Sequence, residues 1–192
     1  MTRIIVFCLI LGTYALTGCA YGFGLSARAL PGSYTQVAIP IFKNNTQEVG
    51  IEMFFTNALV RRFARSQVAQ VTDKENSPLT LEGTIKKIDI AAGPVVTNAT
   101  KGGLRPLPDN AVLATEYRLL VQTEVVLRRK SDDRVVWQGL FQGERVYPAP
   151  RLGAPVVNSA DATYNLSVRN QAIAWLADEM MSEAHDRMTE NF

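Results

Sequence analysis

The chain has 192 residues, of which 20 are Lys or Arg, 18 are Asp or Glu and only two are Cys. Its net charge of +2 argues against a nucleic-acid-binding protein, in which basic residues dominate and cluster. With almost half of its residues hydrophobic, the chain is long enough to bury a real core as one domain.

The N-terminus has the three parts of a secretory signal. Arg3 supplies a positive charge, Ile4 to Leu16 form an apolar run, and the stretch Leu16-Thr17-Gly18-Cys19 follows it. The run is too short to span a bilayer. This layout predicts export of the protein across a membrane.

The stretch before Cys19 resembles the lipobox of bacterial lipoproteins. The resemblance implies that residues 1–18 are a signal peptide, that Cys19 carries the lipid, and that Ala20 favours the outer membrane. We expect residues 19–35 to form a lipidated tether and residues 36–192 a single domain. Several acyl chains hold a protein firmly to a membrane, whereas one chain holds it only marginally.

The first part of the domain predicts a strand, a helix and a second strand. Residues 37–42 are an almost continuous apolar run, in which Pro40 indicates a strand end or a sheet edge. The helix, over about residues 47–66, carries three late arginines, Arg61, Arg62 and Arg65, which we interpret as a solvated helix end. Residues 68–72 follow as a short strand. The apolar stripe predicted for the helix comprises Val49, Met53, Thr56, Leu59, Val60 and Phe63.

The middle of the chain predicts three longer strands. Residues 79–88 alternate as far as Ile85, and Lys86-Lys87 indicates a bulge. Residues 91–110 lack periodicity and predict a long loop, of a length that is usually functional or mobile. Residues 116–128 and 135–146 then predict a hairpin. Outward positions in the first hairpin strand predict a face that is wet or meets a polar partner: Arg118, Gln122, Glu124 and Arg128.

A proline-containing loop over residues 147–158 precedes a last helix over about residues 161–189. Trp175 fits the helix as core filler. The order β-α-β-β-β-β-α predicts an α+β fold, a two-layer sandwich of two amphipathic helices on one mixed sheet, whose first βαβ unit is parallel. The apolar stripe expected in the last helix comprises Leu166, Ile173, Leu176, Ala177, Met180, Met181, Ala184 and Met188.

Few residues offer catalytic chemistry. Without Cys8 and the lipidated Cys19, the mature chain has no thiol for a disulfide, a zinc site or a nucleophile. His185 is the sole histidine, and its position near the end of the last helix favours a structural role. We therefore expect no catalytic residue, no metal and no cofactor.

A two-carboxylate glycosidase would show no motif in a sequence, and a periplasmic hydrolase stays open as an alternative. However, Glu82, Glu116 and Glu144 each fit as outward residues of strands.

Several motifs behind the lipobox resemble the LptE family of lipopolysaccharide-assembly lipoproteins. The resemblance implies a plug inside an LptD-like outer-membrane β-barrel, which helps that barrel to fold and helps to deliver lipopolysaccharide to the outer leaflet. It implies no catalysis and no nucleic-acid partner. The motifs are Leu16 to Phe23, Leu30-Pro31, Val37 to Thr46, the "LxG" strand Leu81 to Ile85, the "xxEYxL" strand Ala114 to Leu119, and Val136-Trp137.

The same resemblance implies binding of lipopolysaccharide through basic residues, because Lys and Arg pair with phosphates. Lys101 and Arg105 in the first long loop and Arg151 in the second are the candidates, and both loops fit at one end of the sandwich. The alternative is that these are solvated loop charges.

A second family-level interpretation remains open. The strand-turn-helix over residues 37–63 also resembles the start of CsgG-like secretion pores and of lipoproteins that activate peptidoglycan synthases. A pore subunit would form a ring of copies and would supply barrel strands.

Overall fold

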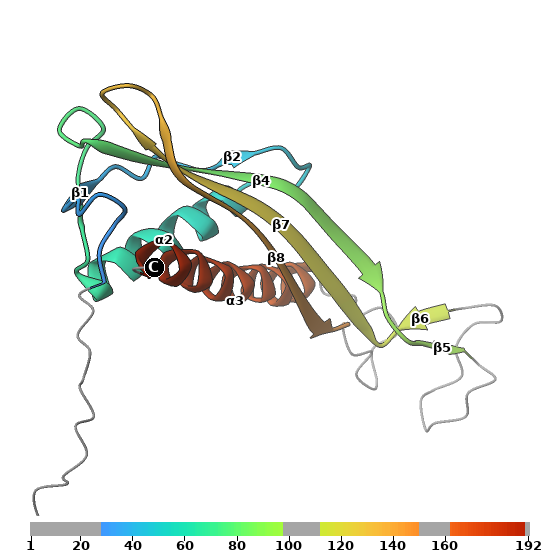
Figure 1. Cartoon of the computed structure of the whole chain (residues 1–192). Helices are drawn as coiled ribbons and strands as arrows, with labels where there is room; N and C mark the ends of the chain where they lie inside the picture. Colours follow the sequence, from blue (N-terminus) through green and yellow to red (C-terminus); the bar gives the residue numbers. More distant parts are fainter. Residues whose placement is uncertain (1–27, 98–111, 150–161, 191–192) are drawn as a thin grey trace, which may run out of the picture.

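Two helices lie on one face of a curved four-stranded sheet (Figure 1). The computed structural model describes residues 28–97, 112–149 and 162–190. The predicted two-layer α+β sandwich is confirmed. In chain order the elements are β1 (Gln36–Val37), β2 (Lys43–Asn44), α2 (Ile51–Ser66), β3 (Gln70–Val71), β4 (Leu79–Ala92), β5 (Val95–Thr97), β6 (Val112–Ala114), β7 (Glu116–Arg129), β8 (Val135–Pro148) and α3 (Ala162–Thr189).

The main sheet has the strand order β2-β4-β7-β8. β2 runs parallel to β4, whereas β4, β7 and β8 are antiparallel. β1 and β3 form a separate parallel pair, as the first βαβ unit predicts. The sheet is therefore mixed, and its long strands are β4, β7 and β8, with 14 residues each.

The prediction of a single strand over residues 37–42 is wrong. The chain pairs at β1, makes one parallel bridge from Ala38 to Thr80, and pairs again only at β2. Pro40 lies in the gap between these pairings. Since proline has no N–H to donate, it interrupts the ladder at this point.

The bulge predicted at Lys86-Lys87 is confirmed. The register of β4 against β7 shifts between Ile85 and Lys87, so that Lys86 is the extra residue. The predicted hairpin of β7 and β8 is also present, and a second register shift lies near its turn, between Leu127 and Arg128.

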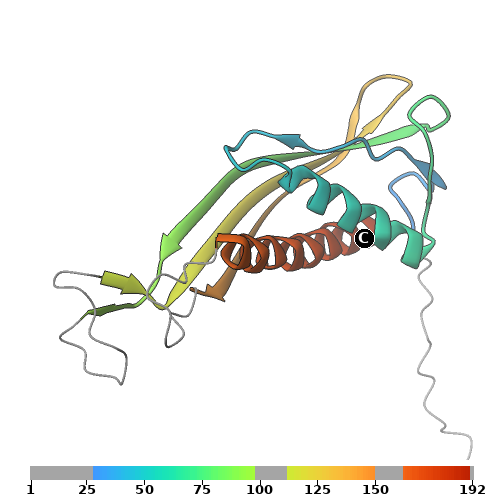
Figure 2. The same ribbon diagram turned by 180° about the vertical axis from the view of Figure 1, so that it is seen from behind.

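The predicted loop over residues 91–110 is shorter than expected, because β4 extends to Ala92 and β5 begins at Val95. β5 pairs with β6 in the register in which β4 pairs with β7, as the partners Ala92–Tyr117 and Val95–Ala114 show. We call β5 and β6 the arm. It continues the β4–β7 ladder past the ends of the helices (Figures 1 and 2).

α2 begins at Ile51 rather than near Gln47. The Asn44 side chain accepts a hydrogen bond from the Thr46 N–H at 2.9 Å and donates one to the Glu48 carbonyl at 2.6 Å. These bonds hold the chain in a turn, and Gly50, with a left-handed φ of 86°, leads into the helix.

The buried side of α2 differs in part from the predicted stripe. Val49 is 95% exposed and Met53 is also exposed, so both predictions were wrong. Leu59, Thr56 and Phe63 are buried as predicted. The remaining buried positions of this helix are Ile51, Phe55 and Ala58.

α3 buries its predicted stripe except for Leu166, which is exposed. The first turns of α3 extend past α2. Arg169 of α3 forms an ion pair with Glu48, which lies just before the start of α2. Further along, α3 comes so close to β8 that a Cβ on Gly143 would lie 2.6 Å from the Leu176 side chain. Only glycine fits at this contact.

Trp175 is not core filler, contrary to expectation. Its ring is half exposed, and the guanidinium of Arg145 lies 4.6 Å from the ring centroid. The pair covers the outside of the contact between α3 and β8 with a cation–π interaction.

Candidate functional site

The face of the main sheet that the helices leave open carries exposed charged and aliphatic side chains. On β8, beyond the first three residues of the strand, every residue that points away from the helices is exposed. Residues that point toward the helices, such as Phe141 and Tyr147, are buried. Both helices lie on the opposite side in two views (Figures 1 and 2). We call this surface the open face.

Charges on the open face neutralise one another across strands. This arrangement agrees with the predicted wet or polar character of the face, because opposite charges on neighbouring strands stabilise a sheet locally. The three cross-strand ion pairs are Lys86–Glu124 at 2.7 Å, Arg118–Glu144 at 3.1 Å and Arg128–Glu82 at 3.5 Å.

Aliphatic side chains lie between these ion pairs. Leu140 is 58% exposed and lies opposite Glu124 in the register, and Val146 is exposed opposite Arg118. Leu120 and Val126 are half-buried on the same side. Such an open mixture of aliphatic positions and paired charges lacks the concave, mostly apolar lining of a small-molecule pocket.

At the end of the sheet from which the arm extends, the strands that flank the predicted lipopolysaccharide-binding residues come together. Tyr117 and Tyr147 stack there with ring centroids 5.6 Å apart, and burial raises the pKa of Tyr147. The N–H of Ala149 donates to the carbonyl of Thr115 at 3.0 Å. The end of β8 therefore lies beside the start of β7 and the base of the arm.

The predicted site residues themselves, Lys101, Arg105 and Arg151, lie outside the described residues, as does the predicted lipidation site Cys19. The structure describes only the strand ends that flank them: the arm on either side of residues 98–111, and Ala149 after β8.

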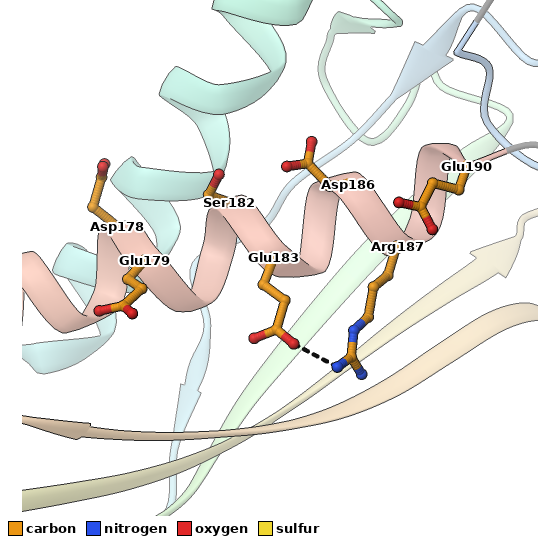
Figure 3. Close-up of a pocket in the computed structure, with 7 residues that line it drawn as sticks. All are labelled: Asp178, Glu179, Ser182, Glu183, Asp186, Arg187 and Glu190. Atoms are coloured by element: carbon orange, nitrogen blue, oxygen red, sulfur yellow. Dashed lines mark ion pairs between the residues drawn. The ribbon is translucent and has the colours of Figure 1, made fainter. Parts of the chain in front are cut away.

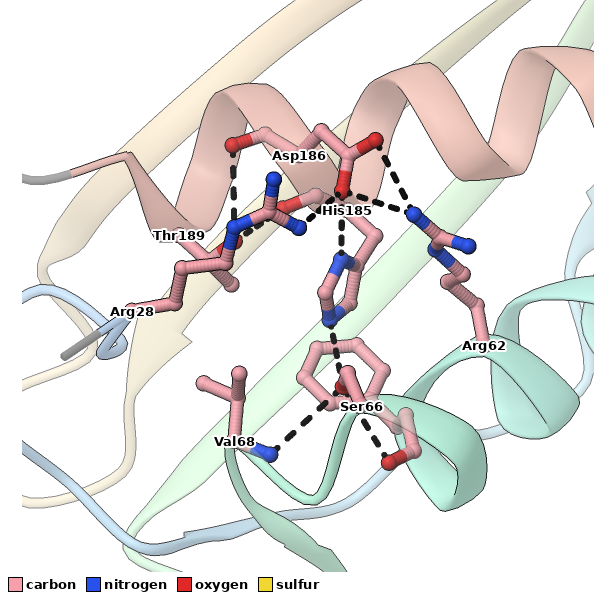
Figure 4. Close-up of polar contacts among 8 residues, drawn as sticks. Arg28, Arg62, Ser66, Val68, His185, Asp186 and Thr189 are labelled. Carbon is pink, nitrogen blue, oxygen red and sulfur yellow. Dashed lines mark hydrogen bonds and ion pairs between the residues drawn. The ribbon is translucent and has the colours of Figure 1, made fainter. Parts of the chain in front are cut away.

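A second polar cluster joins the C-terminal ends of α2 and α3 (Figure 4). His185 is 0% exposed, with Nε2 at 2.8 Å from the Ser66 hydroxyl and Nδ1 at 3.2 Å from the Asp186 carboxylate. Phe63 packs its ring edge-on at 4.9 Å. Because a carboxylate only accepts, Nδ1 carries the proton of the neutral ring and Nε2 accepts from Ser66.

Burial lowers the pKa of His185, although the hydrogen bond and charge of Asp186 act to raise it. Burial by itself would raise the pKa of Asp186, but hydrogen bonds from Arg62 and His185 outweigh it and lower that pKa. The cluster therefore holds a neutral imidazole beside an ionised carboxylate. It connects α2 and α3, and of its members Asp186 also lines the acidic hollow on α3 and Phe63 the apolar groove beside β3, both described below.

Asp186 binds two arginines from different segments. Arg62 of α2 lies 3.0 Å from one of its oxygens, and so does Arg28 at the start of the described chain. Arg61 forms a further pair with Asp178 at 3.3 Å. Arg61 is exposed, as the predicted solvated helix end requires, whereas Arg62 is half-buried, and both pair with α3.

A shallow hollow on the outer side of α3 is acidic (Figure 3). Its negative charge disfavours phosphate groups, and its Glu183 is paired with Arg187 at 2.5 Å. The residues lining it are Asp178, Glu179, Ser182, Glu183, Asp186, Arg187 and Glu190.

An apolar groove lies between the end of α2 and β3. Across residues 28–97, 112–149 and 162–190, no group of three His, Cys, Asp or Glu side chains is placed to hold a metal ion. Neither described helix is long and apolar enough to cross a membrane.

Sequence analysis did not identify Asp186 as the residue that pairs with arginines from two distant segments. Nothing distinguishes it from the other acidic residues of α3, since its partners are 124 and 158 positions away in the chain. The open face, in contrast, was visible as alternating polar positions in residues 116–128.

Comparison with known proteins identifies one family. The sequence model of the LptE family, described as lipopolysaccharide-assembly, matches residues 34–191. None of the curated proteins matches the chain.

Two solved structures illustrate the distant likenesses of the fold. The PelC dodecamer from Paraburkholderia phytofirmans is 14% identical, with a TM-score of 0.49, over 82% of this chain and 90% of that one. A minor lipoprotein from Acinetobacter baumannii is 10% identical, with a TM-score of 0.42, over 80% and 94%. At TM-scores under 0.5, these likenesses say nothing about function.

Proposed function

Because the chain belongs to the LptE family, which the match over residues 34–191 establishes, we propose that it is an outer-membrane lipoprotein that plugs an LptD-like β-barrel. In this function it helps the barrel to assemble and helps to move lipopolysaccharide to the outer leaflet. The family match, whose description is lipopolysaccharide assembly, is the observation that carries the proposal.

The open face supports the role of a plug. The interior of a large outer-membrane barrel is polar, and a domain that fills it needs a surface without a strong net charge. The cross-strand pairs Lys86–Glu124 and Arg118–Glu144 neutralise charges on this face, and Leu140 adds an exposed aliphatic contact. In the proposal the open face meets the barrel wall.

Co-purification tests the partner. The full-length lipoprotein, extracted from outer membranes in mild detergent, should bring down one large barrel, to be identified by mass spectrometry. A homo-oligomeric ring without a barrel would instead favour the secretion-pore alternative and contradict the proposal.

The contact surface is tested by Leu140→Glu, with Met53→Glu as the matched control. Both residues are exposed aliphatic side chains, but Met53 lies on α2. We expect Leu140→Glu to reduce recovery of the barrel several-fold while the melting temperature of the soluble domain stays unchanged. Equal recovery from both variants would show that the open face is not the contact.

Cys19 is the proposed point of lipidation, and the tether it starts would raise the effective concentration of the domain at the barrel. Growth with a labelled fatty acid should label the wild-type protein and leave Cys19→Ala unlabelled. An unlabelled wild type, or mature protein that still begins at Met1, would contradict lipidation.

Lys101, Arg105 and Arg151 are the proposed lipopolysaccharide-binding residues. Their flanking strands meet at one end of the sheet, where β8 ends beside β7. Replacing all three by Gln should weaken binding of lipopolysaccharide to the soluble domain. The matched control replaces three exposed cations at the other end, Arg65, Lys74 and Arg134, and should bind normally. Equal binding by both triple variants would reject the assignment.

A further inference from the structure

The apolar groove between the end of α2 and β3 is a hollow that no described element fills. It encloses about 450 Å³ and lies beside the last two turns of α2. Among the residues that line it, Phe63 and Ala69 are buried, Val60 and Val71 are half-buried, and Ala64 is exposed. Because apolar surface is removed from water when it is covered, an apolar chain segment is a favourable occupant of this groove.

β3, which contributes to the groove, has an unpaired edge. On one side it pairs with β1, where the N–H of Gln70 donates to the carbonyl of Thr35 at 2.8 Å. The N–H of Thr72 likewise donates to the carbonyl of Val37 at 3.0 Å. The N–H and C=O of Val71, which lies between these two donors, therefore point to the other side. No described strand pairs with β3 there, and such an edge accepts another extended segment.

The chain enters the domain at the same end of α2. Arg28, the first residue that the structure describes, pairs with Asp186 at 3.0 Å, and Arg62 of α2 pairs with the same carboxylate (Figure 4). Next to Asp186, the ring of His185 meets Phe63 edge-on, with the ring centroids 4.9 Å apart. Phe63 also lines the groove. The residues that precede Arg28 therefore arrive close to the groove.

The sequence before Arg28 has the pattern of a strand with one apolar side. Residues 20–27 read Ala-Tyr-Gly-Phe-Gly-Leu-Ser-Ala and carry no charge. Tyr21, Phe23 and Leu25 alternate with glycine or serine, which is the period of a strand that buries one face. Residues 21–27 reach at most about 25 Å, roughly twice the diameter of a helix. The segment is therefore long enough to pass the end of α2 and lie in the groove.

We propose that residues 21–25 dock in this groove as an added strand beside β3. The backbone of the segment pairs with the N–H and C=O of Val71, and its three large side chains face Val60 and Ala64 of α2. If Cys19 carries the proposed lipid, docking shortens the free tether from residues 19–27 to residues 19 and 20, which is a change in reach from about 30 Å to about 7 Å. The docking itself does not depend on the proposed function.

A cysteine scan tests the docking and its strand pattern. Ala64→Cys places a thiol in the groove, and a second cysteine replaces each residue from 21 to 25 in turn, in the full-length lipoprotein purified in detergent. A disulfide requires Cα atoms about 4.4–6.8 Å apart. We therefore expect a several-fold higher yield with position 21, 23 or 25 than with Gly22→Cys or Gly24→Cys, which are the matched controls. Mass spectrometry identifies the linked pair, so that a thiol at Cys19 does not affect the result.

Hydrogen exchange of the same full-length protein tests the backbone pairing. Ala64→Glu places a charge in the apolar groove, whereas Asn57→Glu places it at an exposed position of α2 that does not line the groove. The amide of Val71 should exchange several-fold faster in Ala64→Glu than in the wild type, and Asn57→Glu should leave it unchanged. The amide of Gln70, which is bonded to Thr35, should be the same in all three proteins.

The outcomes separate the docking from the proposed function. Equal disulfide yields from all five positions would mean that the segment has no fixed register, and no disulfide at any position would place it elsewhere, such as in the membrane. Either result overturns the docking, as does unchanged exchange of Val71 in Ala64→Glu. Neither experiment involves a barrel or lipopolysaccharide, so these results leave the proposed function standing. Failure to recover a barrel, in turn, leaves the docking standing.

Discussion

At the scale of single residues, the buried polar groups of the core differ in whether they have hydrogen-bond partners. Thr56 accepts the N–H of Phe42 at 3.0 Å and donates to the carbonyl of Glu52 at 2.7 Å. Thr123 is fully buried on β7, opposite Ile85 and Phe141, and its hydroxyl has no hydrogen-bond partner among the described residues. An unmade hydrogen bond of a buried group costs stability, whereas a satisfied one contributes to it.

The same substitution should therefore have opposite effects at these two sites. We expect Thr123→Val to raise the free energy of unfolding by about 1 kcal/mol, and Thr56→Val to lower it by about 1–2 kcal/mol. Urea denaturation of the soluble domain measures both. A loss of stability in Thr123→Val would show that its hydroxyl is hydrogen-bonded in solution.

His185 makes stability depend on pH. Burial holds its pKa in the folded state below its ordinary value of 6.5, so the unfolded chain takes up a proton first as the pH falls. The stability that neutral His185 contributes is fully present above about pH 6.5 and is lost progressively below it. Asp186, whose pKa is lowered from 3.8, loses its contribution only in more acidic solution.

The melting temperature of the soluble domain should accordingly fall between about pH 7.5 and about pH 5.5. His185→Gln, which does not titrate in this range, should show a flatter profile. Parallel profiles for the two proteins would mean that the imidazole is protonated in the folded state or exposed to water.

At the scale of elements, sequence periodicity located both helices, but it identified the buried side of α2 only in part, at Thr56, Leu59 and Phe63. α3 buries its predicted stripe from Ile173 to Met188. α2 carries apolar residues around much of its circumference, and periodicity alone does not decide between the side with Val49 and Met53 and the side with Ile51 and Phe55. The contact of α2 with the sheet and α3 makes that choice.

The arm is an element whose removal the sheet should tolerate. The β4–β7 ladder is complete up to Ala92–Tyr117, and the N–H of Gly93 donates to the carbonyl of Glu116 at 2.9 Å. Replacing residues 94–115 by Asn-Gly, which favours a two-residue hairpin turn, should shift the melting temperature by at most about 4 °C. A much larger loss, followed by circular dichroism, would show that the arm supports the core.

At the scale of the whole molecule, stability should decrease from the centre of the sheet outwards. β7 is paired on both sides, with β4 and with β8, whereas the arm is a two-stranded ribbon. Local opening costs least where few contacts break.

Hydrogen exchange of the soluble domain tests this gradient. Amides from Val121 to Leu127 should exchange last, and those of Val95 to Thr97 among the first of the described strands. Equal protection of the arm and of β7 would indicate that the arm is packed against another part of the chain.

The position of the candidate site was predictable only in part. The sequence indicated the polar face of residues 116–128, and the bulge at Lys86. Alternation along a strand reports which residues share a face, because side chains alternate with a period of two. The ion pairs that neutralise this face join different strands, so only the register of β4, β7 and β8 decides which charges meet.

By itself the sequence determined the class of the fold, the long hairpin and the helix α3, since these follow from local periodicity and turn residues. Only the tertiary structure decided that α2 buries Phe55 rather than Met53, that Arg28 and Arg62 share Asp186, and that the arm extends the sheet away from the entering chain. These features depend on which distant segments approach one another, and a pattern along one segment carries no record of that approach.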